Sequence, residues 1–181
     1  MTGSSTVAAM APIVAAEVFE IEVAFVTPYK LAEGTLATTS AVLLKLVDAD
    51  GVVGWGEANA NVHFTGESPR DAARALADRL LPAVFAAPVP EPGRIDVLLD
   101  GLVAGHLCAK GAVTMALFDI LGKRLGVPVA SLLGGSLRDR LPVLWPLGNG
   151  TADDDMRVID RRAPEGFKTF MLKMGTSPVA E

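Results

Sequence analysis

Residues 109–125 carry the pattern that most constrains how this chain can fold. Five apolar residues recur there at helical spacing and fall on one face: Val113, Ala116, Leu117, Ile120 and Leu121. Gly126 and Pro128 follow directly, and residues of these types commonly end a helix. The segment therefore predicts a long helix whose apolar face must be covered by another element of the same domain.

Three segments nearer the start of the chain are predicted to be strands: residues 14–26, 41–47 and 52–57. The first is rich in Val, Ile and Phe, a composition that favours a strand. Residues 48–51 read Asp-Ala-Asp-Gly, a turn in which Gly51 can take a left-handed backbone conformation. Residues 27–36 contain Pro28 and Gly34 without a clear period, so we expect a loop there. Together these segments predict an antiparallel meander.

Two further helices are expected between the meander and the long helix. Ser68 is a typical N-cap and Pro69 a typical first helical residue, so one helix should run from there to about residue 86. The other should lie between residues 93 and 104. Three strands followed by three helices describe an α+β domain over residues 13–135, preceded by a flexible leader at residues 1–12.

The pattern changes again over residues 136–181. Strands are predicted at residues 141–147 and 168–174, with a helix at residues 152–163 between them. Alternation of strand and helix is typical of parallel βα units. Ser177 and Pro178 then resemble a helix start four residues before the last residue, so we expect a truncated barrel.

Composition excludes several classes of function. The net charge of −5 leaves no basic surface for nucleic acid or an anionic membrane. The single cysteine, Cys108, rules out an internal disulfide framework, and the two histidines, His63 and His106, lack zinc-site spacing. The apolar run at residues 7–16 is too short to span a bilayer and lacks the basic start of a signal peptide. We therefore expect a soluble, cytoplasmic protein.

Four stretches, in chain order, resemble the mandelate racemase/muconate-lactonizing group of the enolase superfamily. They are residues 50–58, with Gly-Trp-Gly-Glu-Ala; residues 109–123; residues 126–135, ending in Leu-Leu-Gly-Gly; and residues 166–175. Two further stretches, residues 64–69 and 144–150, are similar to the muconate cycloisomerases within this group. The resemblance implies an α+β capping domain followed by the start of a (β/α) TIM-type barrel.

The resemblance also implies the chemistry. Enzymes of this group use Mg²⁺, or Mn²⁺, to bind the carboxylate of a small substrate while a side chain moves the proton on the α-carbon. A muconate cycloisomerase is the expected type, and an N-acylamino acid racemase or a dipeptide epimerase is the alternative. A homo-oligomer is also implied. A competing expectation is an inactive fragment, because the family's carboxylate metal ligands lie on later barrel strands and none is expected in this chain.

Lys173 is the catalytic residue that the resemblance implies. The family places two lysines two residues apart on this barrel strand, and Lys173 matches the second, which acts as acid or base. Met171 takes the place of the first and would line the substrate site. Lys168 is an odd number of residues away and should face the opposite side of the strand. Spacing alone does not distinguish Lys173 from a solvated lysine at a strand end.

Two capping-domain segments, residues 27–35 and 61–66, match regions that in the family fold over the barrel mouth. Tyr29, His63 and Phe64 are therefore candidates for substrate contact. Four other large side chains are expected to be core: Trp55, Met115, Phe118 and Trp145. Glu57 and Asp119 are expected to make structural hydrogen bonds, and Cys108 to be buried at a helix start.

Overall fold

A computed structural model of the chain describes residues 10–31, 34–147 and 151–172. The described residues divide into two compact units. The first comprises residues 10–22 and 40–136, and the second comprises the described parts of residues 23–39 and 137–172. No helix within the described ranges is long and apolar enough to cross a membrane.

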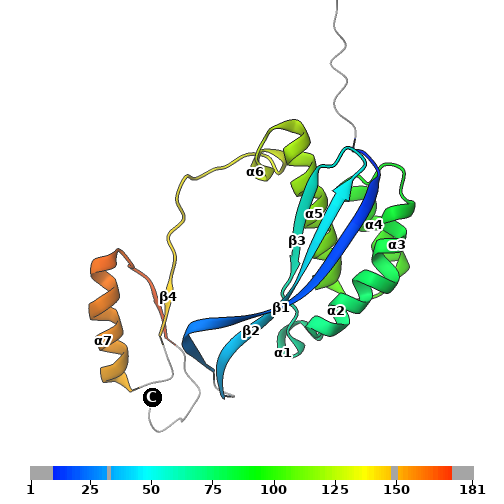
Figure 1. The fold of residues 1–181 in the computed structure, drawn as a ribbon. Helices are drawn as coiled ribbons and strands as arrows, with labels where there is room; N and C mark the ends of the chain where they lie inside the picture. Colours follow the sequence, from blue (N-terminus) through cyan, green and yellow to red (C-terminus); the bar gives the residue numbers. More distant parts are fainter. Residues whose placement is uncertain (1–9, 32–33, 148–150, 173–181) are drawn as a thin grey trace, which may run out of the picture. The chain divides into compact units, whose positions relative to one another are not determined.

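A three-stranded sheet forms one layer of the first unit, and the described parts of residues 23–39 of its first two strands belong to the second unit. The strands of this sheet are β1 (Ile13–Leu31), β2 (Gly34–Asp48) and β3 (Val53–Ala58), in the order β1-β2-β3 (Figure 1). β2 and β3 run antiparallel, with Leu44 opposite Gly56, and the predicted turn between them places Gly51 at φ 82°. The antiparallel meander predicted from the sequence is confirmed.

The loop predicted over residues 27–36 is wrong for the part that the structure describes, residues 27–31 and 34–36. β1 continues to Leu31 and β2 begins at Gly34, so the two strands extend well beyond the predicted strand ends. Pro28 lacks a backbone donor, but β1 lies at the edge of the sheet, where a missing donor is tolerated. Pro28 and Gly34 therefore mark the end of a hairpin and do not interrupt its strands.

A long helical segment follows the sheet, as predicted. It comprises α2 (Pro69–Ala75), a π-helical turn η1 (Leu76–Leu80) and α3 (Leu81–Ala86). Ser68 is the N-cap, and its side chain and that of Asp71 each accept a hydrogen bond from the other residue's backbone N–H. The hydrogen bonds from Ser68 hold the pKa of Asp71 below its usual value.

Two more helices complete the helical layer on one side of the three strands (Figure 1). They are α4 (Pro92–Leu102) and α5 (Leu107–Leu125), and α5 begins two residues before its predicted start. Four of the five residues predicted to form its apolar face are fully buried, and the fifth, Leu121, is half-buried. Gly126 ends α5 in a left-handed conformation, at φ 66°, as the sequence predicts.

The backbone of β3 lies directly against α5. A Cβ on Gly56 would lie 1.9 Å from the carbonyl oxygen of Ala112, and one on Gly54 would lie 2.2 Å from that of Ala116. Only glycine leaves room for so close an approach of strand and helix. The alternation Gly54-Trp55-Gly56 therefore directs both glycines to the helix.

Trp55 consequently lies on the outer face of the sheet, so its predicted place in the core is wrong. It is 44% exposed and stacks on Phe19, with ring centroids 6.1 Å apart. Met115 is also wrongly predicted, because it lies on the outer side of α5 and is 48% exposed. Phe118 and Trp145 are half-buried.

A buried ion-pair network joins the β2–β3 turn to the end of α5. Asp48 is 1% exposed, and its Oδ1 accepts hydrogen bonds from the backbone N–H groups of Asp50 (3.0 Å) and Val52 (2.8 Å). Arg124 donates from Nη2 to Asp50 at 2.8 Å and from Nη1 to Asp48 at 2.6 Å. These two hydrogen bonds raise the pKa of Arg124 above its usual value. The network fixes the hairpin to the helix.

After α5 the chain forms a short helix, α6 (Val129–Leu132).

The second unit contains the predicted parallel strands, but they are short. β4 (Trp145–Pro146) and β5 (Phe170–Met171) pair in parallel, and α7 (Ala152–Arg162) and a 3₁₀ turn η2 (Ala163–Glu165) connect them. The sequence predicts strands at residues 141–147 and 168–174. Among the described residues of these two ranges, only two in each range form a strand. A parallel strand needs partners on both sides to extend its pairing, and each of these has one described partner.

Candidate active site

Residues 61–66, predicted as a loop over the barrel mouth, form a single helical turn, α1 (Val62–Thr65). Asn61 caps it, because its Oδ1 accepts the backbone N–H of His63 at 3.0 Å. The hydroxyl of Thr65 accepts from the backbone N–H of Asn61 and donates to its carbonyl. Gly66 ends the turn at φ 68°. These contacts close α1 into a small unit of fixed shape.

The α1 turn presents the two capping-domain candidates to solvent. Phe64 is 79% exposed and His63 is also exposed, and neighbouring Val62 is 58% exposed. Two of the apolar side chains on this turn are thus open to solvent. Both candidates are therefore accessible at the surface of the first unit.

Glu67, directly after the turn, is a buried charged residue that the sequence analysis does not single out. It is 5% exposed, and its carboxylate contacts Nδ1 of His106 at 3.0 Å and the backbone N–H of Cys108 at 3.2 Å. Both partners lie about 40 residues further along the chain. No local pattern marks such a contact, and the resemblance of residues 64–69 concerns the segment and not this residue. Cys108, expected to be buried, is half-buried in the first turn of α5.

The barrel candidates belong to the second unit. The backbone of Met171 lies in β5 opposite Pro146, its carbonyl accepts from the N–H of Leu147 at 2.9 Å, and its side chain is 40% exposed. Lys173 lies outside the described residues, two positions beyond Met171. The backbone of Tyr29 lies in β1, but its side chain is outside the description. Lys168 is exposed.

An aromatic and cationic cluster holds α7 against β4. The guanidinium of Arg162 lies over the ring of Trp145, 4.0 Å from its centroid, and Phe167 packs edge-on at 5.0 Å. Arg162 also pairs with Glu165 at 2.6 Å. Such cation–π contacts contribute about 1 kcal/mol where the groups are partly exposed. This cluster positions the segment that leads into β5.

The candidates are brought together only within each unit. His63 and Phe64 lie side by side on α1, and Met171 lies in the second unit, as does the backbone of Tyr29. In the described ranges, no group of three or more His, Cys, Asp or Glu side chains could hold a metal ion.

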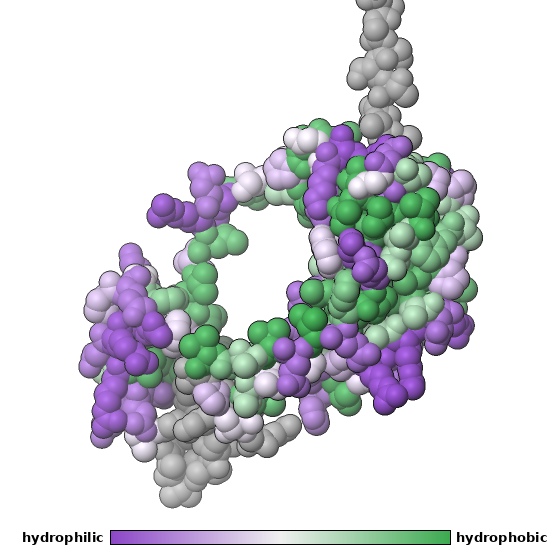
Figure 2. All heavy atoms as spheres, viewed as in Figure 1, coloured by the Kyte–Doolittle hydropathy of each residue, from purple (hydrophilic) through white to green (hydrophobic). Residues whose placement is uncertain are grey.

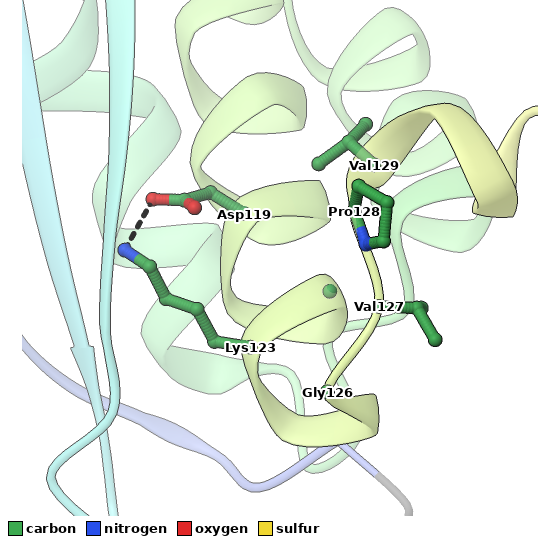
Figure 3. Close-up of a pocket in the computed structure, with 7 residues that line it drawn as sticks. Asp119, Lys123, Gly126, Val127, Pro128 and Val129 are labelled. Atoms are coloured by element: carbon green, nitrogen blue, oxygen red, sulfur yellow. Dashed lines mark hydrogen bonds and ion pairs between the residues drawn. The ribbon is translucent and has the colours of Figure 1, made fainter. Parts of the chain in front are cut away.

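A surface depression of about 310 Å³ lies between the end of α5 and residues 126–129 (Figure 3). Its charged residues already have partners. Lys123 pairs with Asp119 at 2.7 Å and donates to the carbonyl of Val53, and Asp119 accepts from the backbone N–H of Trp55. Asp119 and Lys123 thus cap the free edge of β3, which confirms the structural hydrogen bonding predicted for Asp119.

Fold and geometry define an α+β domain of three strands and covering helices, followed by a parallel βα segment. Residues 13–134 match the family described as mandelate racemase/muconate lactonizing enzyme, N-terminal domain. The chain belongs to this family. The capping-domain fold predicted from the sequence is therefore confirmed.

Similar proteins include enzymes with different reactions. The chain is 35% identical to muconate cycloisomerase 1 of Acinetobacter baylyi over 167 residues, which cover 90% of this chain and 45% of that one. It is 28% identical to the N-succinyl-L-Arg/Lys racemase of Bacillus cereus, covering 91% of this chain and 45% of that one.

Solved structures show the same fold. A muconate lactonizing enzyme from Pseudomonas fluorescens, solved with muconolactone, aligns with a TM-score of 0.86 at 30% identity. The alignment covers 93% of this chain and 46% of that one. The chain therefore spans less than half the length of the relatives it matches.

Proposed function

We propose that this chain forms the capping domain and first barrel strands of a Mg²⁺-dependent enzyme that transfers the proton α to a carboxylate. The observation that carries the proposal is the family match over residues 13–134, because it covers the whole capping domain. Muconate cycloisomerases are among the relatives that share at least 35% identity with the chain. A lactonizing cycloisomerase is thus the favoured reaction, and a small dicarboxylate the favoured substrate.

Lys173 is the proposed acid or base. In lactonization, a carboxylate oxygen adds to a double bond while the ammonium group of Lys173 delivers a proton to the α-carbon. A C–O and a C–H bond form, and the lysine is left neutral. In the reverse direction the neutral amine removes the same proton. A positioned proton donor of this kind typically contributes a rate factor of about 10²–10⁴.

The capping residues would select the substrate. Phe64 and His63 are exposed on a turn of fixed shape, which suits contact with a ligand or with the barrel mouth. Met171 offers an apolar, uncharged side chain two residues before Lys173, and Tyr29 would contribute from the β1–β2 hairpin. Substrate contact by these four residues remains a proposal.

The proposed cofactor, Mg²⁺ or Mn²⁺, would neutralise the substrate carboxylate and make its α-proton more acidic. The described residues do not supply its ligands, so they are expected on further barrel strands. Apolar side chains of the second unit would also pack there: Leu137, Leu141, Val143 and Leu172 are between 59% and 99% exposed. Figure 2 shows hydrophobic residues along the segment between α6 and β4.

A racemase or epimerase of N-acylated amino acids or dipeptides is the second candidate. The Bacillus cereus racemase structure aligns with a TM-score of 0.86, equal to that of the lactonizing enzyme. In that reaction a second lysine across the barrel would take the proton from the other face of the substrate. A cytoplasmic homo-oligomer is proposed in either case.

The proposal can be tested by co-expressing this chain with the part of a relative that its match leaves uncovered, such as the second half of the Acinetobacter enzyme. We expect Lys173→Ala to lower Mg²⁺-dependent muconolactone formation by at least about 10³-fold, because the proton donor is lost. The measurement is the lactonization rate of co-purified complexes, with N-succinyl amino acid racemisation assayed in parallel.

Lys168→Ala is the matched control, because it removes a lysine that should face away from the site. It should leave the rate within a few-fold of the unsubstituted complex. A complex that assembles but catalyses neither reaction would overturn the assignment. Undiminished turnover in Lys173→Ala would overturn the role of Lys173.

A further inference from the structure

Glu67 places an almost fully buried carboxylate at the junction between α1 and α2. Its side chain is 6% exposed, and each oxygen has its own partner. Oε1 lies 3.0 Å from Nδ1 of His106, and Oε2 accepts the backbone N–H of Cys108 at 3.2 Å. Burying a carboxylate is costly unless its oxygens are hydrogen-bonded, so these contacts fix where the side chain can lie.

The partners of Glu67 belong to the start of α5, the best-packed helix of the first unit. His106 precedes α5, and Cys108 lies in its first turn, where backbone N–H groups lack helical acceptors. Oε1 of Glu67 and Nδ1 of His106 share one hydrogen bond, in which the ring nitrogen is the donor when the carboxylate accepts. One side chain therefore joins the α1 segment to the start of a helix whose inner face is buried.

The backbone of His106 is a second observation at this contact, because its conformation is one that non-glycine residues rarely adopt. Within the described ranges it is the one non-glycine residue with a positive φ, at 51°. Such a conformation costs a non-glycine residue roughly 1 kcal/mol and persists when its surroundings hold it in place. The hydrogen bond to Glu67 is a contact that holds the His106 ring in this position.

The α1 turn itself is closed by Asn61 and Thr65, so it can move as one piece. Thr65 Oγ1 also accepts from the backbone N–H of Glu67, at 3.4 Å, which ties the turn to the residue that anchors it. A change at Glu67 would therefore reorient α1 without dismantling it.

We propose that Glu67 is a positioning residue that fixes the direction in which the α1 turn presents His63 and Phe64. Its carboxylate acts through His106 and the first turn of α5, and does not touch a ligand. The consequence for substrate selection rests on the proposed function, in which α1 contacts substrate. The positioning itself is independent of any activity.

The test is ¹⁵N relaxation on the 181-residue chain, comparing Glu67→Gln with the unsubstituted protein. We expect order parameters at residues 62–66 to fall from about 0.85 to below about 0.6, while those of α5 residues stay near 0.85. The imidazole ¹⁵N shifts of His106 should lose the pattern of a proton held on Nδ1. Glu57→Gln, which changes an exposed glutamate on β3, is the matched control and should alter neither.

His106→Gly provides a second variant, because it relieves the backbone strain and removes the ring that Glu67 holds. The native fold should persist, while the order parameters of α1 fall as in Glu67→Gln. Order parameters in α1 that stay at the level of α5 in both variants would overturn the proposal. An equal fall in α1 and α5 would also overturn it, because that result indicates a general structural role. Neither measurement needs turnover, so a failed activity assay does not affect the result.

Discussion

Replacing Gly56 with alanine is expected to prevent native packing of the first unit. The new Cβ would lie 1.9 Å from the carbonyl oxygen of Ala112 and 2.7 Å from its carbonyl carbon. Both atoms belong to the backbone of α5, so no side-chain rotation can relieve the overlap. The helix or the strand must move, and the core between them would open. Overpacking a tight core costs about 1–3 kcal/mol, and a backbone clash should exceed that range.

The measurement is urea unfolding followed by circular dichroism, with the free energy of unfolding compared between variants. Gly101→Ala is the matched control, because Gly101 lies in α4 and nothing lies within 4 Å of its added Cβ. Alanine in a helix is favoured over glycine by about 0.5–1 kcal/mol, so the control should be neutral or stabilising. Gly56→Ala with stability equal to that of the unsubstituted chain would contradict the described packing of β3 on α5.

Replacing Asp48 with alanine is expected to lower the free energy of unfolding by about 3–5 kcal/mol. The side chain of Asp48 is fully buried and accepts two backbone N–H groups of the turn as well as Arg124. Its removal leaves those partly buried donors without their acceptor and detaches the β2–β3 hairpin from the end of α5. Because many small domains have only 5–15 kcal/mol of stability, such a loss is large.

Asp50→Ala is the control for the same network. Asp50 also pairs with Arg124, at 2.8 Å, but its side chain is 62% exposed. Exposed ion pairs contribute less than about 1 kcal/mol, so this variant should unfold close to the unsubstituted protein. Equal losses from the two substitutions, measured by urea unfolding, would show that burial of Asp48 is not what makes it important.

The helices could be predicted from sequence because their evidence is local. The α5 helix shows its buried face as a regular spacing of apolar residues and its end as Gly126, and Ser68 followed by Pro69 marks the start of α2. Caps and periodicity involve residues within one or two turns of each other. Contacts between distant residues leave no such pattern.

The errors follow from that limit. Trp55 was predicted to be core because tryptophan usually is, but the glycines on either side of it must face α5, which directs the indole outward. Pro28 and Gly34 indicated a loop over residues 27–36. In the structure β1 continues to Leu31 and β2 begins at Gly34, so strand residues enter this range from both sides. In each case tertiary packing decided what local preference left open.

The candidate site was predictable only in part. The family resemblance led to His63 and Phe64, which the structure places on an exposed turn. Glu67 escaped prediction because its partners lie about 40 residues away and a glutamate before a helix is ordinary. Lys173 remains a prediction from the resemblance.

The most direct test of this account is a turnover assay on the 181-residue polypeptide alone, after intact mass spectrometry has confirmed a mass near 18.8 kDa. The sample would receive Mg²⁺ with cis,cis-muconate or with N-succinyl amino acids. We expect no Mg²⁺-dependent turnover, because the metal ligands and most barrel strands are expected outside these residues. Rates like those of full-length relatives, from material of verified mass, would contradict the account.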